Sequence, residues 1–148
     1  MKKYIIALYG VLSYGIFFFA FLYMIGFLAN SVVPTTIDGN SHVLPTTAVF
    51  INLGLVTLFG AAHSMMARSW FKKWWTRIIP HAAERSTYVL QASLLLLLIV
   101  TQWQALPTTL WSIGNETARL AIWSIFWLGH AITLISTFLI NHFELTGL

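Results

Sequence analysis

Few side chains in this sequence can do acid–base or nucleophilic chemistry. The 148 residues include five His, four Asp or Glu, eight Lys or Arg, and no Cys. The lack of Cys excludes disulfides, thiolate metal sites and a Cys nucleophile. The remaining candidates are ionisable or polar residues at the ends of apolar stretches: His63, Arg68, Glu84, Arg85, Tyr88, Asn141 and His142. We expect no metal site among them.

These residue types suit proton transfer beside an anion. A His can accept a proton near neutral pH, and a nearby Arg stabilises an anion. A cluster of ionisable groups at one membrane face is typical of a functional site. The alternative interpretation is that long side chains reach toward the interface, with Glu84 and Arg85 forming an ion pair. The sequence contains no dinucleotide, P-loop, G-x-S-x-G or H-E-x-x-H motif.

The elements that carry these residues belong in a lipid bilayer. Charged residues make up 8% of the chain and hydrophobic residues 58%, whereas soluble domains are about 25% charged. A membrane-spanning helix needs about 20 mostly apolar residues. Four stretches meet this requirement: residues 4–28, 47–66, 87–105 and 117–143. The sequence therefore predicts an all-α polytopic membrane protein, with a single domain of four transmembrane helices in a bundle.

Lys and Arg are distributed unevenly between the two sides of such a bundle. Seven of the eight fall on one side: Lys2, Lys3, Arg68, Lys72, Lys73, Arg77 and Arg85. Only Arg119 falls near the other side. Because basic loops stay in the cytoplasm, we expect both termini and the Trp-rich connection 67–86 there, in a bacterial inner membrane. This orientation accounts for the basic charge, so we expect no nucleic-acid partner. The same connection is also compatible with an amphipathic surface helix.

Polar residues recur within three of the predicted spans. Asn52 and His63 are eleven residues apart, as are Gln91 and Gln102, and as are His130 and Asn141. Eleven residues is close to three turns of an α-helix, so the members of each pair lie on one face. Costly polar groups at membrane depth face other helices. We expect Asn52 and the two Gln to form interhelical hydrogen bonds, and His130 to be a satisfied core histidine.

Four strings of residues resemble a known family. They read H-S-M-M-A-R from His63, F-K-K-W-W-T-R from Phe71, E-R-S-T-Y-V-L from Glu84 and S-T-F-L-I-N-H-F-E-L from Ser136. These strings resemble the membrane methanethiol S-methyltransferases. The wider group includes the NnrU-like proteins and, more distantly, the isoprenylcysteine carboxyl methyltransferases. The resemblance covers nearly the whole chain.

The resemblance implies S-adenosylmethionine as methyl donor, a small thiol as acceptor and dimethyl sulfide as product. For that chemistry we expect His63 or His142 as general base and Arg68 or Arg85 as the group holding anions. Glu84 would orient the Arg, and Tyr88 and Asn141 would complete the pocket. Family members continue with an R-H-P-x-Y-type motif, and this sequence contains no R-H-P string. We therefore expect the N-terminal portion of such an enzyme, partnered by lipid, the thiol, and a C-terminal fragment or a second copy.

Two other functions remain open at the level of sequence. A non-catalytic membrane protein would fit the NnrU-like branch of the group. A haem-binding electron carrier would take axial ligands from His63, His130 and His142. Binding of S-adenosylmethionine distinguishes the enzyme from the first alternative, and an absorption spectrum with a Soret band identifies the second.

Overall fold

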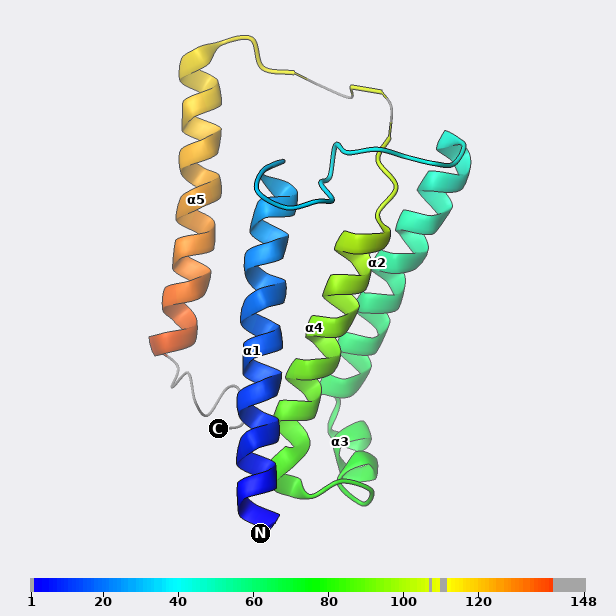
Figure 1. The fold of residues 1–148 in the computed structure, drawn as a ribbon, viewed down its shortest axis with the longest axis vertical. Helices are drawn as coiled ribbons and strands as arrows, with labels where there is room; N and C mark the ends of the chain where they lie inside the picture. The colour runs from blue at the N-terminus through cyan, green and yellow to red at the C-terminus, as the bar shows by residue number, and fades with distance from the viewer. Residues whose placement is uncertain (1, 107, 110–111, 140–148) are drawn as a thin grey trace. The chain divides into compact units, whose positions relative to one another are not determined.

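The structure is a computed structural model that describes residues 2–106, 108–109 and 112–139 (Figure 1). Its helices are α1 (Lys2–Leu28), α2 (Pro45–Ala67), α3 (Ser69–Trp75), the short 3₁₀ helix η1 (His81–Ala83), α4 (Glu84–Gln102) and α5 (Glu116–Leu139). The described part of the chain contains no β-strand. It falls into two compact units, residues 2–106 and residues 108–139, which are described separately below.

Four segments are long and apolar enough to cross a membrane: Tyr4–Leu28, Pro45–Ala67, His81–Gln102 and Glu116–Ser136. Large apolar side chains on them stay exposed, such as Phe50 at 74% and Leu53 at 60%. Such surfaces suit contact with lipid rather than water. The predicted all-helical fold with four candidate spans is therefore confirmed.

The third span differs in its ends from the predicted 87–105. The helix α4 begins at Glu84, directly after η1, and ends at Gln102. Glu84 lies in the first turn, where a carboxylate interacts favourably with the helix dipole. After Gln102 the backbone of Gln104 pairs with the side chain of Asn52 in α2 instead of continuing the helix. The fourth predicted span also extends past Leu139, where its last residues lie outside the described part of the chain.

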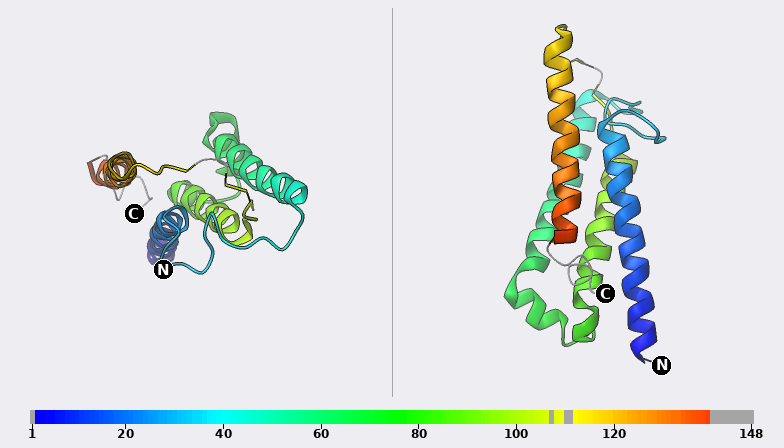
Figure 2. Two further views of the ribbon diagram at one scale, coloured as in Figure 1. Left: turned by 90° about the horizontal axis from the view of Figure 1, so that it is seen from above. Right: turned by 90° about the vertical axis from the view of Figure 1, so that its left-hand side faces the viewer.

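In the first unit, α4 lies between α1 and α2 and packs against both (Figures 1 and 2). The helices α1 and α4 run in the same direction, and α2 runs in the opposite one. As a result, the start of α1, the end of α2, α3 and the start of α4 lie at one end of this unit. We call this end the basic end, because the seven Lys and Arg between residues 2 and 85 occur in those segments or in the connections between them.

The buried positions of α1 and of α4, which pack together, recur at a regular spacing. In α1 the buried positions Ser13, Ala20 and Phe27 are seven residues apart. Ser86, Ser93 and Val100 of α4 are buried with the same spacing. A repeat of seven keeps one seam of a helix facing its partner, and small side chains let two backbones approach closely. We call these six residues the α1–α4 seam.

The loop of residues 29–44 closes the end opposite the basic end. It turns back over α1, where a Cβ on Gly26 would lie 2.9 Å from the Ser31 carbonyl oxygen. Asn30 and Val32 have positive φ angles of 52° and 69°. Asn tolerates this region, whereas a β-branched Val there is strained. Bonds to the helices hold the loop: the Thr35 hydroxyl donates to the Val100 carbonyl oxygen at 2.8 Å.

In the second unit, α5 is capped at its N-terminus and exposes apolar side chains around it. The Asn115 side-chain oxygen accepts a hydrogen bond from the Ala118 backbone N–H at 3.0 Å, which satisfies one free donor of the first turn. The Nδ1 atom of His130 lies 2.9 Å from the Phe126 carbonyl oxygen within the same helix. Ile125 and Leu128 are 69% and 61% exposed.

Candidate active site

The centre of the candidate site is a contact between His63 of α2 and Tyr88 of α4, at the basic end. The phenol oxygen of Tyr88 lies 2.8 Å from Nε2 of His63 and 3.2 Å from Nδ1. The two ring centroids are 5.1 Å apart. Phe59 stacks nearly parallel to the imidazole, with centroids 5.4 Å apart and an angle of 16°. The imidazole is therefore held by two rings.

His63 faces α4, as expected from its spacing of eleven residues from Asn52, which puts the two residues on one face of α2. The Asn52 side chain meets the far end of α4: its Nδ2 donates to the Gln104 carbonyl oxygen at 2.7 Å, and its Oδ1 accepts from the Gln104 N–H at 3.0 Å. Both residues thus lie on the α4-facing side of α2. Asn52 forms a hydrogen bond as predicted, but its partner Gln104 lies just after α4 rather than in a helix. The difference is exposure. Asn52 is 7% exposed, whereas His63 is exposed and can meet a small molecule.

Glu84 ties the connection between α2 and α4 to the first turn of α4. Its carboxylate lies 3.5 Å from the Lys72 ammonium and 4.0 Å from Nδ1 of His81. The Glu84 side chain is 15% exposed, compared with 48% for Lys72. The residues found beside this carboxylate are thus a Lys and a His of the connection. Orientation of an Arg by Glu84 stays a prediction.

The two predicted arginines lie at the same end of the first unit. Arg68 separates α2 from α3, where the backbone leaves the helical region at φ −72° and ψ 140°, and its side chain is exposed. Arg85 follows Glu84 in the first turn of α4, and its side chain is also exposed. The basic end thus presents guanidinium groups on both sides of the connection that joins α2 to α4.

The other predicted site residues, Asn141 and His142, lie outside the described residues. His130 belongs to the second unit, where its bond to Phe126 agrees with a satisfied histidine. Among the residues that the structure describes, no three His, Asp or Glu side chains come close enough to hold a metal ion.

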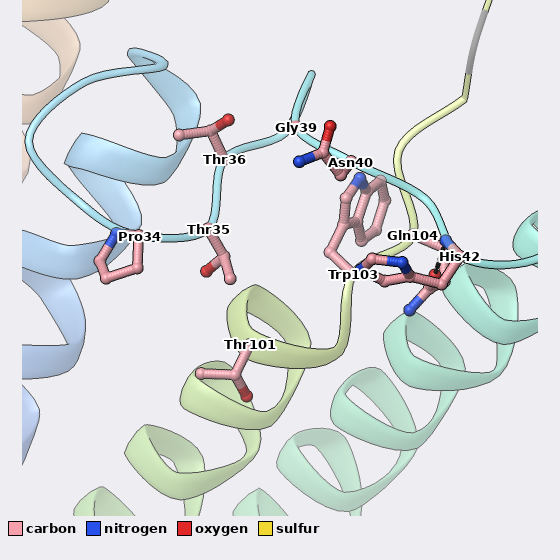
Figure 3. Close-up of a pocket in the computed structure, with 9 residues that line it drawn as sticks. All are labelled: Pro34, Thr35, Thr36, Gly39, Asn40, His42, Thr101, Trp103 and Gln104. Carbon is pink, nitrogen blue, oxygen red and sulfur yellow. Dashed lines mark hydrogen bonds between the residues drawn. The ribbon is translucent and has the colours of Figure 1, made fainter.

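A cavity lies at the end of the first unit opposite His63, under the loop of residues 29–44 (Figure 3). Its volume is about 370 Å³. Its lining is polar but carries no formal charge: Thr35, Thr36, Asn40, His42, Thr101 and Gln104 contribute most of it. Figure 3 shows His42 beside Gln104, whose side-chain oxygen accepts the His42 backbone N–H at 3.3 Å. The cavity is far along α2 and α4 from His63, so we treat it as a separate feature.

The chain is similar in sequence to several known proteins. It is 49% identical over all 148 residues to the methanethiol S-methyltransferase of Mycobacterium tuberculosis, covering 61% of that protein. It is 44% identical over 148 residues to the methanethiol S-methyltransferase of Crocosphaera subtropica, covering 58% of that protein. It is also 47% identical over 146 residues to methanethiol S-methyltransferase 1 of Bradyrhizobium diazoefficiens, covering 51% of it.

The chain is a homologue of methanethiol S-methyltransferases. The family resemblance inferred from its sequence is thereby confirmed. The chain spans between 51% and 61% of the length of these three relatives. No family model matches the sequence, and no solved structure matches it either.

Sequence reasoning missed several contacts of this methanethiol S-methyltransferase homologue. The stacking of Phe59 on His63 was signalled only by a spacing of four residues on one helix. His81 and Glu84 are three apart, so their contact also had a local signal. The approach of Lys72 to Glu84 had none, because it depends on the path of the connection between α2 and α4.

Proposed function

We propose that the protein methylates methanethiol with S-adenosylmethionine to give dimethyl sulfide, and that the thiol reacts beside His63 at the basic end. The observation that carries this proposal is the hydrogen bond between His63 and Tyr88 in a homologue of methanethiol S-methyltransferases. It supplies a held, exposed imidazole at the end of two membrane helices. A small apolar thiol can reach such a position from the lipid.

The residues present at the basic end fit the proposed methyl donor in their chemistry. The donor carries a carboxylate, an ammonium and a sulfonium. The guanidinium of Arg68 or Arg85 suits the carboxylate, and Glu84 suits the ammonium. The ring faces of Phe59 and Tyr88 suit the sulfonium, since aromatic faces attract cations. When bound, S-adenosylmethionine would supply the methyl group, which passes to a sulfur nucleophile as its bond to the sulfonium breaks and S-adenosylhomocysteine leaves.

The chain's own residues then have three tasks. His63 accepts the proton of the thiol S–H bond, because the thiolate is the nucleophile. Tyr88 holds the imidazole through its hydroxyl, which fixes the orientation in which the ring meets the thiol. A guanidinium stabilises the thiolate until its sulfur bonds to the methyl carbon. Holding the two reactants together contributes up to about 7–11 kcal/mol in ideal cases.

The charge distribution supports an orientation with the basic end in the cytoplasm of a bacterial inner membrane. Lys and Arg concentrate on the cytoplasmic side of membrane proteins. The first unit has its seven Lys and Arg in segments at one end, although residues 68–85 are far from residues 2–3 in sequence. A polar, cytosolic methyl donor would then enter next to His63. Asn141, His142 and a second copy of the chain remain proposed partners of this site.

A methyltransfer assay on His63→Ala tests this function. Membranes containing the chain receive methanethiol and S-adenosylmethionine, and dimethyl sulfide is measured by gas chromatography of the headspace. We expect turnover from the wild type and a loss of about 100-fold or more in His63→Ala, the usual contribution of a general base. His42→Ala, at the opposite end, is the matched control and keeps full turnover.

Two results would contradict the proposal. A wild-type chain that forms no dimethyl sulfide contradicts the activity. A folded His63→Ala variant with wild-type turnover removes His63 from the mechanism while leaving the activity in place. Helix content from circular dichroism verifies that each variant is folded.

A further inference from the structure

The helix α3 carries an apolar hollow beside the end of α2. We call it the α3 hollow. Its volume is about 350 Å³, and it is lined by Met65, Trp70, Phe71 and Trp74. Three of its members keep large exposed fractions: 60% for Trp70, 48% for Trp74 and 44% for Met65. Phe71 supports both indoles, with centroids 5.8 Å from Trp70 and 5.5 Å from Trp74.

The opposite side of α3 is basic. At 3.6 residues per turn, Trp70, Phe71 and Trp74 lie on one side of the helix, Lys72 lies on the other, and Lys73 lies between the two sides. Lys73 is three residues from Trp70 and therefore flanks the α3 hollow. Arg77 follows the helix by two residues, and the side chains of Lys73 and Arg77 are both exposed.

The positive charge beside the hollow is not neutralised locally. Glu84 is the only acidic residue between Asp38 and Glu116, and its carboxylate already lies 3.5 Å from Lys72. Among the described residues, no carboxylate pairs with Lys73 or Arg77. An exposed apolar surface flanked by unpaired cations calls for a ligand that is both apolar and anionic.

We propose that this surface of α3 binds an anionic phospholipid. An acyl chain lies against the α3 hollow, and the headgroup phosphate lies at Lys73 and Arg77. The location agrees with this ligand, because α3 directly follows the end of α2, a segment long and apolar enough to cross a bilayer. Amphipathic segments with Trp on one side and Lys or Arg on the other lie in the membrane interface, where basic clusters attract anionic headgroups.

Fluorescence quenching by brominated lipids tests this inference without any use of catalytic activity. The chain is reconstituted in phosphatidylcholine bilayers that contain a small fraction of brominated phosphatidylglycerol or of brominated phosphatidylcholine. A Trp70→Phe/Trp74→Phe variant lacks the two indoles of the α3 hollow. The quenching due to α3 is therefore the difference in quenching between the wild type and this variant. We expect brominated phosphatidylglycerol to produce this quenching at several-fold lower mole fraction than brominated phosphatidylcholine.

Charge-removing variants show whether the preference comes from α3. In Lys73→Gln/Arg77→Gln the preference falls by roughly fivefold for each cation removed. Lys2→Gln/Lys3→Gln removes the same charge near the start of α1 and keeps the preference. Equal quenching by both lipids would overturn the inference, as would a preference that survives loss of Lys73 and Arg77. Protection of the hollow by a second copy, seen as quenching by neither lipid, would overturn it too.

Discussion

Polar residues in α2 serve different purposes according to their exposure. Asn52 is buried and pairs with both backbone groups of Gln104, so that its side chain holds α2 to the segment that follows α4. His63 lies on the same side of α2 but is exposed, and it contacts a side-chain hydroxyl rather than a backbone. One residue is therefore suited to structure and the other to chemistry.

Replacement of Asn52 by Leu, which has a similar volume, should destabilise the first unit by about 1–2 kcal/mol. The N–H and C=O groups of Gln104 would lose their partners in an apolar setting. The free energy of unfolding, measured by titration with sodium dodecyl sulfate in mixed micelles, would report this loss. Thr57→Val is the matched control, since Thr57 is an exposed residue of the same helix. Equal stability of Asn52→Leu and wild type would contradict the structural role of the amide.

At the scale of elements, the packing of α1 on α4 depends on small side chains. The α1–α4 seam repeats every seven residues on both helices, and four of its six members are Ser or Ala. Ser93 is 2% exposed, and its hydroxyl donates to the Val89 carbonyl oxygen of its own helix at 2.7 Å. Its contribution to the contact is thus its small size rather than a bond to α1.

Ser93→Leu should therefore separate α1 from α4, whereas Ser93→Ala should be tolerated. Inserted methylene groups in a packed contact cost about 1–3 kcal/mol, while Ala keeps the seam narrow. Thermal unfolding of the two variants in detergent, followed by circular dichroism, makes the comparison. If Ser93→Leu were as stable as Ser93→Ala, close packing at the seam would not be what holds the two helices together.

The whole first unit separates a basic end from a polar end whose loop, residues 29–44, contains no Lys or Arg. α3 and the connection 68–83 lie at the basic end, and the loop of residues 29–44 lies at the other (Figure 1). If the basic end is cytoplasmic, the methyl donor, the thiol and His63 meet on that side. The cavity under the loop of residues 29–44 then opens on the opposite side of the membrane.

Cysteine labelling tests this orientation directly, because the chain has no Cys of its own. A membrane-impermeant maleimide added to intact cells should label Asn40→Cys in the loop of residues 29–44 and leave Ile78→Cys unlabelled. Ile78 is 62% exposed, so accessibility of the residue itself does not limit the reaction. After the cells are permeabilised, both should react. Labelling of Ile78→Cys in intact cells would place the basic end outside and reverse the proposed route of the donor.

Much of this arrangement could be predicted from the sequence, for identifiable reasons. Long apolar stretches define the spans, and a spacing of eleven residues places Asn52 and His63 on one face of α2. The α1–α4 seam was not predicted, because hydropathy does not separate Ser or Ala in a helix contact from those facing lipid. The positive φ of Val32 could not be predicted either, since contacts of its loop impose it.

The contacts of the candidate site also include some that the sequence could predict and some that it could not. The encounter of His63 with Tyr88 follows from consecutive spans of similar length that run in opposite directions, so the sequence could place them together. The partners of Glu84 depend on how residues 68–83 turn between α2 and α4. No local pattern encodes that path, which is why Lys72 was not expected beside the carboxylate.

The most direct test of the central claim, that Tyr88 acts through His63, is a double-mutant cycle on the kcat/KM of dimethyl sulfide formation. We predict a loss of about 100-fold or more for His63→Ala and about 10-fold for Tyr88→Phe, which removes one hydrogen bond. The double variant should be no slower than His63→Ala alone, because residues that act as a unit are not additive. If the two losses multiplied in the double variant, His63 and Tyr88 would act independently, and their hydrogen bond would not be the basis of the site.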